Sequence, residues 1–243
     1  MKTFACTALS TALFAGMAGA QSISGMTTPQ VFSFTDIPNF SNSFNVAQFD
    51  AAAVAAGLAG GFTAGDVTLT GVEISLDVST TGGQLEFDND GVDGGTVTAD
   101  FGVLSSLSSS DVALPAVQAN PFVSDTFTLS GDTPNSGTDG ATFDGGQSGD
   151  SDFGTLDGAS LSDSAGATLT SGLSAFEGTG TLGFDVDTST FVNFSGLSGL
   201  SSAVSPADVE GSLSVKYNFT AVPTPASAAL IGHGGLVAAR RRR

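Results

Sequence analysis

The chain has 243 residues, of which 40% are hydrophobic, so it can bury the core of one sizeable domain or two small ones. It carries 24 acidic residues against six basic ones, and all of the acids lie between Asp36 and Glu210, a stretch without any Lys or Arg. Recognition of nucleic acids and of anionic lipid surfaces depends on Lys and Arg, so the composition excludes a nucleic-acid partner.

The first 20 residues have the pattern of a secretory signal peptide. Lys2 supplies a short positive region, an apolar stretch runs from Phe4 to Met17, and the small residues Ala18 and Ala20 frame the expected cleavage site. The only cysteine, Cys6, lies within this segment, so no disulfide is expected in the mature protein.

Residues 21–221 form the expected mature body, and their apolar residues alternate with a period of two. Strands are predicted at 31–34, 66–78, 126–129, 179–187 and 211–219, with a break in the alternation at Gly71 that indicates a β-bulge. Turn-rich clusters of Gly, Asp, Ser and Asn separate the strands. The pattern predicts an all-β fold, an antiparallel β-sandwich that is jelly-roll-like or immunoglobulin-like.

Two further features of the body bear on packing. The segment 49–58, FDAAAVAAGL, is rich in alanine and predicts a short helix or a loop at one end of the sandwich. The chain has 19 phenylalanines, no tryptophan and one tyrosine. The phenylalanines are interpreted as core residues, because a ligand-stacking surface more usually employs Trp or Tyr.

Five short motifs follow one another in the first half of this body: FTDIP at 34–38, VAQFD at 46–50, LTGVEI at 69–74, LEFDN at 85–89 and TVT at 96–98. Their order resembles that of the choice-of-anchor E domain. The resemblance implies a β-rich domain joined to a surface-anchoring tail, with no established enzymatic activity. The sequence departs from the family by an insertion rich in alanine and glycine at 51–65.

The residue types that catalysis usually requires are nearly absent from the body. The single histidine, His233, lies in the C-terminal segment, and the body contains no cysteine and one lysine. Ser-His triads, zinc sites and Schiff-base chemistry are therefore excluded. A carboxylate pair remains, but glycosidase sites usually add aromatic and basic side chains that this chain lacks. We expect no enzymatic activity.

An acidic stretch at 88–94, DNDGVDG, leaves two alternatives open. A solvated acidic turn is the favoured interpretation. The other is a calcium site, with no other cofactor expected, because hard cations bind several carboxylate and amide oxygens at once. Val92 breaks the spacing of an EF-hand loop. The candidate calcium ligands are Asp88, Asn89, Asp90 and Asp93.

The last residues of the chain form a second expected targeting segment, after the signal peptide. Residues 226–239 are apolar and small, although His233 and three glycines interrupt them, and Arg240, Arg241, Arg242 and Arg243 follow directly. The arginines predict a stop-transfer segment that inserts transiently in the membrane. The alternative is an amphipathic C-terminal helix packed on the body.

The motif VPTPAS precedes this apolar stretch; its residues are Val222, Pro223, Thr224, Pro225, Ala226 and Ser227. Motif, apolar stretch and arginines together resemble the PEP-CTERM sorting signal of Gram-negative bacteria, with Thr224 in place of the usual glutamate. The resemblance implies cleavage near the Pro-x-Pro motif by an exosortase, a membrane cysteine protease, during export.

The sequence thus predicts three parts: a signal peptide at 1–20, a β-sandwich body at 21–221 and a sorting signal at 222–243. The expected location is the cell surface, the outer envelope or an extracellular matrix, with extracellular polysaccharide or matrix components as partners. The expected role is structural or adhesive. The alternative is a calcium-dependent module that binds carbohydrate or another surface polymer.

Overall fold

Four long strands with alternating buried and exposed side chains determine the shape of the molecule: β4 (Val67–Thr81), β6 (Gly95–Ser108), β11 (Thr181–Ser195) and β13 (Asp208–Ala221). The structure is a computed structural model, and it describes residues 22–131 and 151–223. The shorter strands are β1 (Ile23–Met26), β2 (Gln30–Asp36), β3 (Phe40–Ala47), β5 (Gln84–Asn89), β7 (Val117–Ala119), β8 (Phe122–Leu129), β9 (Phe153–Asp157), β10 (Leu161–Leu169) and β12 (Leu200–Ser205). Three short helices complete the elements: α1 (Ala51–Gly57), η1 (Ala64–Asp66) and η2 (Leu173–Phe176).

The strands form three sheets, and their ladders are antiparallel. Sheet A has the order β1-β13-β4-β10, with β2 also paired to β13. Sheet B has the order β3-β11-β6-β7, with β8 also paired to β6. Sheet C has the order β12-β5-β9. The expected antiparallel, sandwich-like all-β fold is therefore confirmed.

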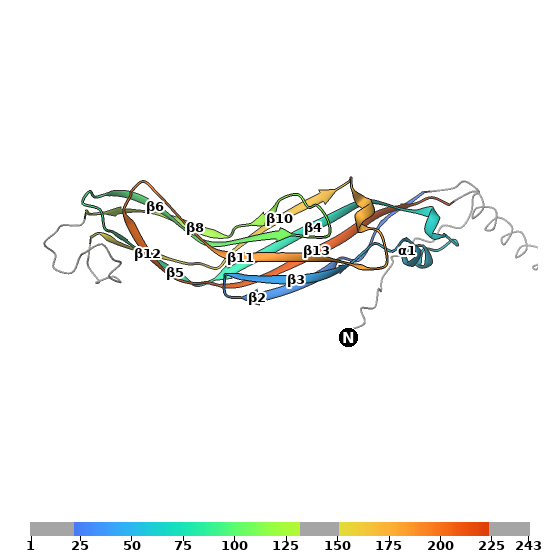
Figure 1. Ribbon diagram of the computed structural model, residues 1–243, viewed down its shortest axis with the longest axis horizontal. Helices are drawn as coiled ribbons and strands as arrows, with labels where there is room; N and C mark the ends of the chain where they lie inside the picture. Colours follow the sequence, from blue (N-terminus) through green and yellow to red (C-terminus); the bar gives the residue numbers. More distant parts are fainter. Residues whose placement is uncertain (1–21, 132–150, 224–243) are drawn as a thin grey trace, which may run out of the picture.

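Sheet C continues sheet A along the long axis of the body (Figure 1). The strands β12, β5 and β9 adjoin β13, β4 and β10 in the chain, and the two sheets have the same strand order. The continuation is interrupted at a line that we call the waist, which consists of residues 82–83, 158–160 and 206–207. Sheet B has no such break, because β6 and β11 stay paired along their length, from the pair Ser108–Asp185 to the pair Thr98–Ser195.

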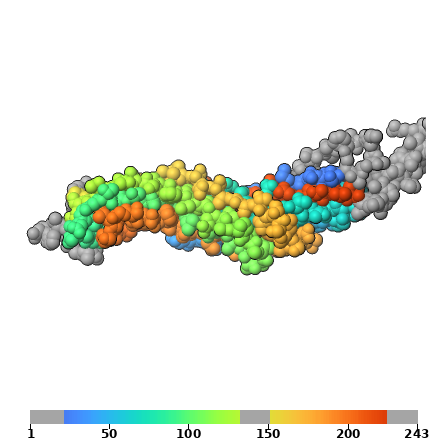
Figure 2. All heavy atoms as spheres, turned by 90° about the horizontal axis from the view of Figure 1, so that it is seen from above, coloured from blue at the N-terminus to red at the C-terminus, as the bar shows by residue number. Residues whose placement is uncertain are grey.

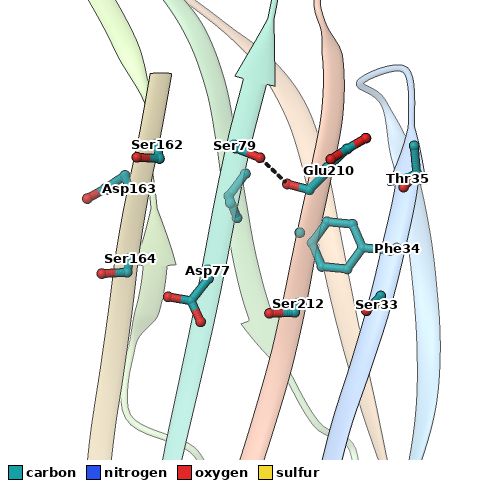
Figure 3. Close-up of a pocket in the computed structure, with 12 residues that line it drawn as sticks. Ser33, Phe34, Thr35, Asp77, Ser79, Ser162, Asp163, Ser164, Glu210 and Ser212 are labelled. Atoms are coloured by element: carbon teal, nitrogen blue, oxygen red, sulfur yellow. Dashed lines mark hydrogen bonds between the residues drawn. The ribbon is translucent and has the colours of Figure 1, made fainter. Parts of the chain in front are cut away.

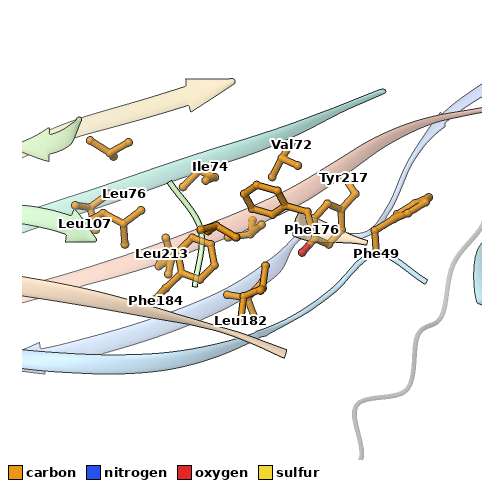
Figure 4. Close-up of a cluster of buried hydrophobic side chains, with 14 of the residues drawn as sticks. Phe49, Val72, Ile74, Leu76, Leu107, Phe176, Leu182, Phe184, Leu213 and Tyr217 are labelled. Carbon is orange, nitrogen blue, oxygen red and sulfur yellow. The ribbon is translucent and has the colours of Figure 1, made fainter. Parts of the chain in front are cut away.

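The sandwich consequently encloses two hydrophobic clusters. The larger cluster lies between sheets A and B, and Figure 4 shows Leu76, Phe184 and Leu213 packed there. The smaller cluster contains Leu85 and Phe87 from sheet C together with β6 residues of sheet B. Strand β6 contributes to both, since Phe101 belongs to the smaller cluster and Val103 to the larger one.

Glycines allow the backbones to approach one another at the waist. Gly83 has a φ of +83°, and an added Cβ would lie 2.8 Å from the backbone nitrogen of Ala207 and 3.0 Å from the ring of Phe101. The backbone N–H of Gly158 donates to the carbonyl of Gly83 over 3.0 Å, and an added Cβ on Gly158 would overlap the carbonyl of Gly82. Side chains at these positions would push the strands apart.

Phenylalanine rings cover glycines on neighbouring strands. Phe219 lies opposite Gly25, Phe87 opposite Gly154 and Phe34 opposite Gly211, and in each pair the ring occupies the place of the missing side chain. Such cross-strand pairs protect backbone that would otherwise be exposed. They account for several of the core phenylalanines expected from the sequence. Phe122 departs from that expectation, because it is 44% exposed.

One edge of the sandwich is closed by hydrogen bonds between sheets A and B. The side chain of Gln30 donates to the carbonyl of Ala47 and accepts from its N–H, over 2.9 and 2.8 Å. The hydroxyl of Tyr217 donates to the same carbonyl over 2.8 Å. Burial raises the pKa of Tyr217 to about 12, so the hydroxyl keeps its proton at all physiological pH values. The end of β3 is thereby fixed to sheet A.

The sequence-based elements agree with this architecture. The five predicted strands coincide with parts of β2, β4, β8, β11 and β13, although the predictions at 66–78 and 179–187 begin one and two residues before β4 and β11. The bulge is confirmed, because Asn218 pairs with Gly71 while Phe219 pairs with Leu69, which leaves Thr70 as the extra residue. The alanine-rich segment forms the helix α1, whose first turn is capped by the carboxylate of Asp50.

Both ends of the described chain lie at the same end of the body. Ile23 of β1 pairs with Ala221 of β13, and the N–H of Val222 donates to the carbonyl of Asp66 in η1 over 2.8 Å. Sheet C lies at the opposite end (Figure 1 and Figure 2). Within residues 22–131 and 151–223, no helix has the length and apolar character needed to span a bilayer. The expected signal peptide and C-terminal apolar segment lie outside these residues.

The waist gives a first prediction. In Gly83→Ala, a residue with a Cβ must adopt the left-handed backbone conformation of Gly83, and this Cβ presses against Ala207. We therefore expect the free energy of unfolding to fall by about 2–4 kcal/mol. Gly65→Ala is the control, because its Cβ would be 3.9 Å from the nearest atom. Denaturant unfolding measures both, and equal stability of the two variants would contradict the packing described for the waist.

Candidate functional site

The outer face of sheet A carries an open groove of about 580 Å³ that crosses β2, β13, β4 and β10 (Figure 3). Its side chains are mostly hydroxyls and carboxylates, because these strands place polar residues at every second position. The pairing registers align them in two rows across the sheet. One row consists of Thr35, Glu210, Ser79 and Ser162, and the other of Ser33, Ser212, Asp77 and Ser164.

Most side chains in both rows are short, with Glu210 as the exception. The hydroxyl of Ser79 donates to the backbone carbonyl of Glu210 over 3.3 Å. At the edge of the groove, the carboxylate of Asp163 accepts from the N–H of Asn120 over 2.7 Å, which connects β10 to the segment after β7. The groove therefore offers hydroxyl donors and carboxylate acceptors across four strands.

A second, smaller hollow of about 300 Å³ lies on the same face and contains an ion pair. The ammonium of Lys216 lies 2.6 Å from the carboxylate of Glu73, and the amide of Asn218 donates to the same carboxylate over 2.7 Å. Hydrogen bonds from Lys216 and then Asn218 lower the pKa of Glu73. Lys216 is the single Lys or Arg within residues 22–131 and 151–223, and its charge is balanced by that of Glu73.

The four candidate calcium ligands occupy different environments. Asp88 and Asn89 end strand β5 and are 4% and 1% exposed, whereas Asp90 and Asp93 lie in the following turn. The expectation that all four lie on one turn is therefore wrong for the first two. Over the residues that the structure describes, no three His, Cys, Asp or Glu side chains come together in a way that could hold a metal ion.

Asn89 has a structural role in this region. Its amide donates to the carbonyls of Asp93 and Ser130, over 3.1 and 2.6 Å, and its oxygen accepts from the N–H of Gly91 over 3.1 Å. These bonds fix the turn after β5 to the end of β8. Binding of calcium at this stretch stays a prediction, in which Asn89 would have to give up its bond to Gly91 or share its oxygen.

The residues expected to direct export lie mostly outside the described chain. Val222 and Pro223 follow β13 directly, and Val222 is 48% exposed. The remaining motif residues, 224–227, lie outside the described residues, as do Ala18, Ala20 and the arginines at 240–243. The structure thus places the beginning of the motif at the end of the body, on the surface.

The rows of hydroxyls were missed in the sequence, although a signal for them exists. Serine or aspartate recurs at every second position at 75–79, and serine does so at 162–164 and 212–214, which predicts one polar face on each strand. What the sequence lacks is the register that aligns the three strands. The cross-strand partners of Asp77, namely Ser212 and Ser164, are 135 and 87 residues away in the chain.

Comparisons with known proteins leave the chain without a family. No family model matches it, and no significant match is found among curated proteins. Solved structures from infectious bursal disease virus are among those that the chain resembles. The structure of its Gx strain is 15% identical over 83% of this chain and 42% of that chain, with a TM-score of 0.15, and its VP2 subviral particle is 14% identical over 88% and 49%, with a TM-score of 0.13. The chain spans less than half the length of these proteins, and scores this low support no argument.

Substitution of Asn89 separates its structural role from metal binding. Asn89→Asp removes both amide donors from a buried position while adding a carboxylate, so we expect unfolding to become easier by about 2–3 kcal/mol with or without calcium. Asn39→Asp serves as control, because Asn39 is exposed and its φ of 78° is tolerated by Asn and Asp alike. Recovery of native stability by Asn89→Asp on addition of calcium would show instead that this stretch is a metal site.

Proposed function

We propose that this chain is an exported protein of the cell surface, outer envelope or extracellular matrix, with a structural or adhesive role and no catalysis of its own. Its sequence supports export at both ends, through the signal-peptide pattern of residues 1–20 and the VPTPAS motif with its apolar stretch and terminal arginines. In this proposal an exosortase-type protease processes the tail, and the partners are extracellular polysaccharide or matrix components.

The observation that carries the proposal is the position of the two chain ends. Strands β1 and β13 pair at their termini, so residues 22 and 223 leave the body at one end, beside α1 and η1. A body held there would project its long axis outward, with sheet C farthest from the attachment. Strand β4 and β5 together contain 21 residues, which corresponds to roughly 70 Å of extended chain.

The resemblance to the choice-of-anchor E domain is part of the same proposal. Its five motifs fall at β2, at the end of β3, on the bulged part of β4, on β5 and at the start of β6, so each one lies in or beside a strand. The insertion at 51–65 forms α1 and most of η1, at the end of the body where the tail leaves. The resemblance implies a β-rich body joined to a surface-anchoring tail, and the insertion, which departs from the family, lies at the end from which that tail leaves.

Intact mass spectrometry of the protein from its native producer tests the proposal. We expect the protein in the cell-surface and medium fractions to lack residues 1–20 and the residues beyond about Pro225, because the signal peptide and the sorting signal are both removed during export. Replacing Pro223 and Pro225 with alanine should leave the tail uncut and reduce the surface fraction. A surface protein that keeps residues 226–243 would contradict sorting by cleavage.

A further inference from the structure

Two phenylalanines lie side by side on the outer face of sheet B. Phe122 of β8 and Phe191 of β11 are both register partners of Gly102 in β6, and their ring centroids are 5.6 Å apart with an interplanar angle of 63°. Neither ring belongs to either hydrophobic cluster. Phe122 is 44% exposed and Phe191 is half-buried. We call these two rings the aromatic pair.

The aromatic pair differs from the other Phe–Gly pairs of this fold. At Gly25, Gly154 and Gly211, a single ring covers the glycine, and that ring is buried within a hydrophobic cluster. Across Gly102, two rings meet on the outer face, where no second sheet formed by residues 22–131 and 151–223 covers them. Adjacent exposed aromatic rings retain apolar surface that a partner can remove from water.

Hydrogen-bonding groups lie in the rows next to the aromatic pair. One row along the strands, about 7 Å away, the amide of Asn193 donates to the carboxylate of Asp100 over 2.9 Å. In the row beyond, the hydroxyls of Thr98 and Thr126 are 3.2 Å apart. The face therefore combines exposed rings with amide, carboxylate and hydroxyl groups, which are the groups that orient a polar ligand.

Charge determines which occupant suits this face. Asp100, Asp185 and Asp187 lie on the same outer side of sheet B, and neither β6, β8 nor β11 carries a Lys or Arg. An anionic polymer would be repelled, and so would a second copy of this chain, which carries 24 acids. A neutral sugar polymer has no such penalty, since its ring C–H faces pack on aromatic rings while its hydroxyls donate to carboxylates.

We propose that the aromatic pair and the adjoining row of Asp100 and Asn193 bind a neutral polysaccharide. This inference names the partner class for the adhesive role proposed above and rests on it. The rings supply apolar contact for one sugar unit, and the polar row supplies hydrogen bonds for the next. The site lies on sheet B, away from both the groove of sheet A and the acidic stretch at 88–94, and it requires no calcium.

Native gel electrophoresis of the purified protein in gels that contain one polysaccharide each tests this site. The probes are a β-1,3-glucan, dextran and galactomannan as neutral polymers, and alginate as an anionic one. We expect at least one neutral polymer to retard the protein, equally with a chelator present and at about 0.05 and 0.5 M NaCl, because no ion pair is involved. Phe122→Thr and Phe191→Thr should each weaken this retardation about tenfold.

Two controls keep the outcome specific. Val204→Thr changes a valine of similar exposure on β12, in sheet C, and should migrate as the native protein does. Asp77→Asn removes a carboxylate from the groove of sheet A and should also leave retardation unchanged. Thermal unfolding of every variant shows whether the fold is kept.

Four results would contradict the proposed binding site. The first two are retardation by none of the neutral polymers and retardation by alginate alone. The other two are retardation that Phe122→Thr leaves unchanged and retardation that Asp77→Asn abolishes. Unfolding of both Phe variants would also overturn it if Asp100→Ala and Asn193→Ala, which keep the rings, bind as the native protein does. Because the gel uses purified protein, its outcome is separate from the processing of the tail, which mass spectrometry reports.

Discussion

The close approach of backbones at the waist is the constraint on which the shape of this protein depends. Gly83 and Gly158 bring two backbones together where sheet A ends and sheet C begins, and Ala207, between β12 and β13, packs against Gly83. Sheet B crosses the same level without interruption through β6 and β11. One continuous sheet therefore supports two shorter ones, and the sandwich becomes long while each hydrophobic cluster stays narrow enough to be filled by side chains of two layers.

An elongated body with its chain ends together separates two tasks in space. The end with β1, α1 and the start of the sorting motif serves attachment in the proposed function. The outer faces between the ends remain free for a partner, and they differ in chemistry: hydroxyls and carboxylates on sheet A, aromatic rings beside an amide–carboxylate pair on sheet B. The one ion pair described, between Lys216 and Glu73, occurs on sheet A. Because the described residues include one Lys and no Arg, the proposed recognition uses apolar contacts and hydrogen bonds and no ion pair.

Much of the fold could be predicted because its signals are local. Period-two alternation at 66–78 and 211–219 predicts strands, and the break at Gly71 predicts the bulge. The waist could not be predicted, since the contact of Gly83 with Ala207 joins residues 124 positions apart and nothing local distinguishes Gly83 from a turn glycine. The role of Asn89 was hidden for a similar reason, because one of its partners, Ser130, belongs to the segment after β8. The exposure of Phe122 depends on which face of β8 meets sheet C, and that is decided by pairing with β6.

The orientation of the body on the cell surface is the central claim, and energy transfer measures it directly. The only native cysteine lies in the expected signal peptide, so Ala53→Cys in α1 and Val92→Cys beyond β5 each give a single labelling site on the mature protein. Val92 is 76% exposed, and it lies at the sheet C end of the body. With a donor dye on the cysteine and a lipophilic acceptor in the outermost membrane of living producer cells, attachment through the C-terminal end that remains after cleavage predicts stronger transfer from residue 53 than from residue 92. Equal transfer from both sites, or stronger transfer from residue 92, would contradict a body that projects outward from that end.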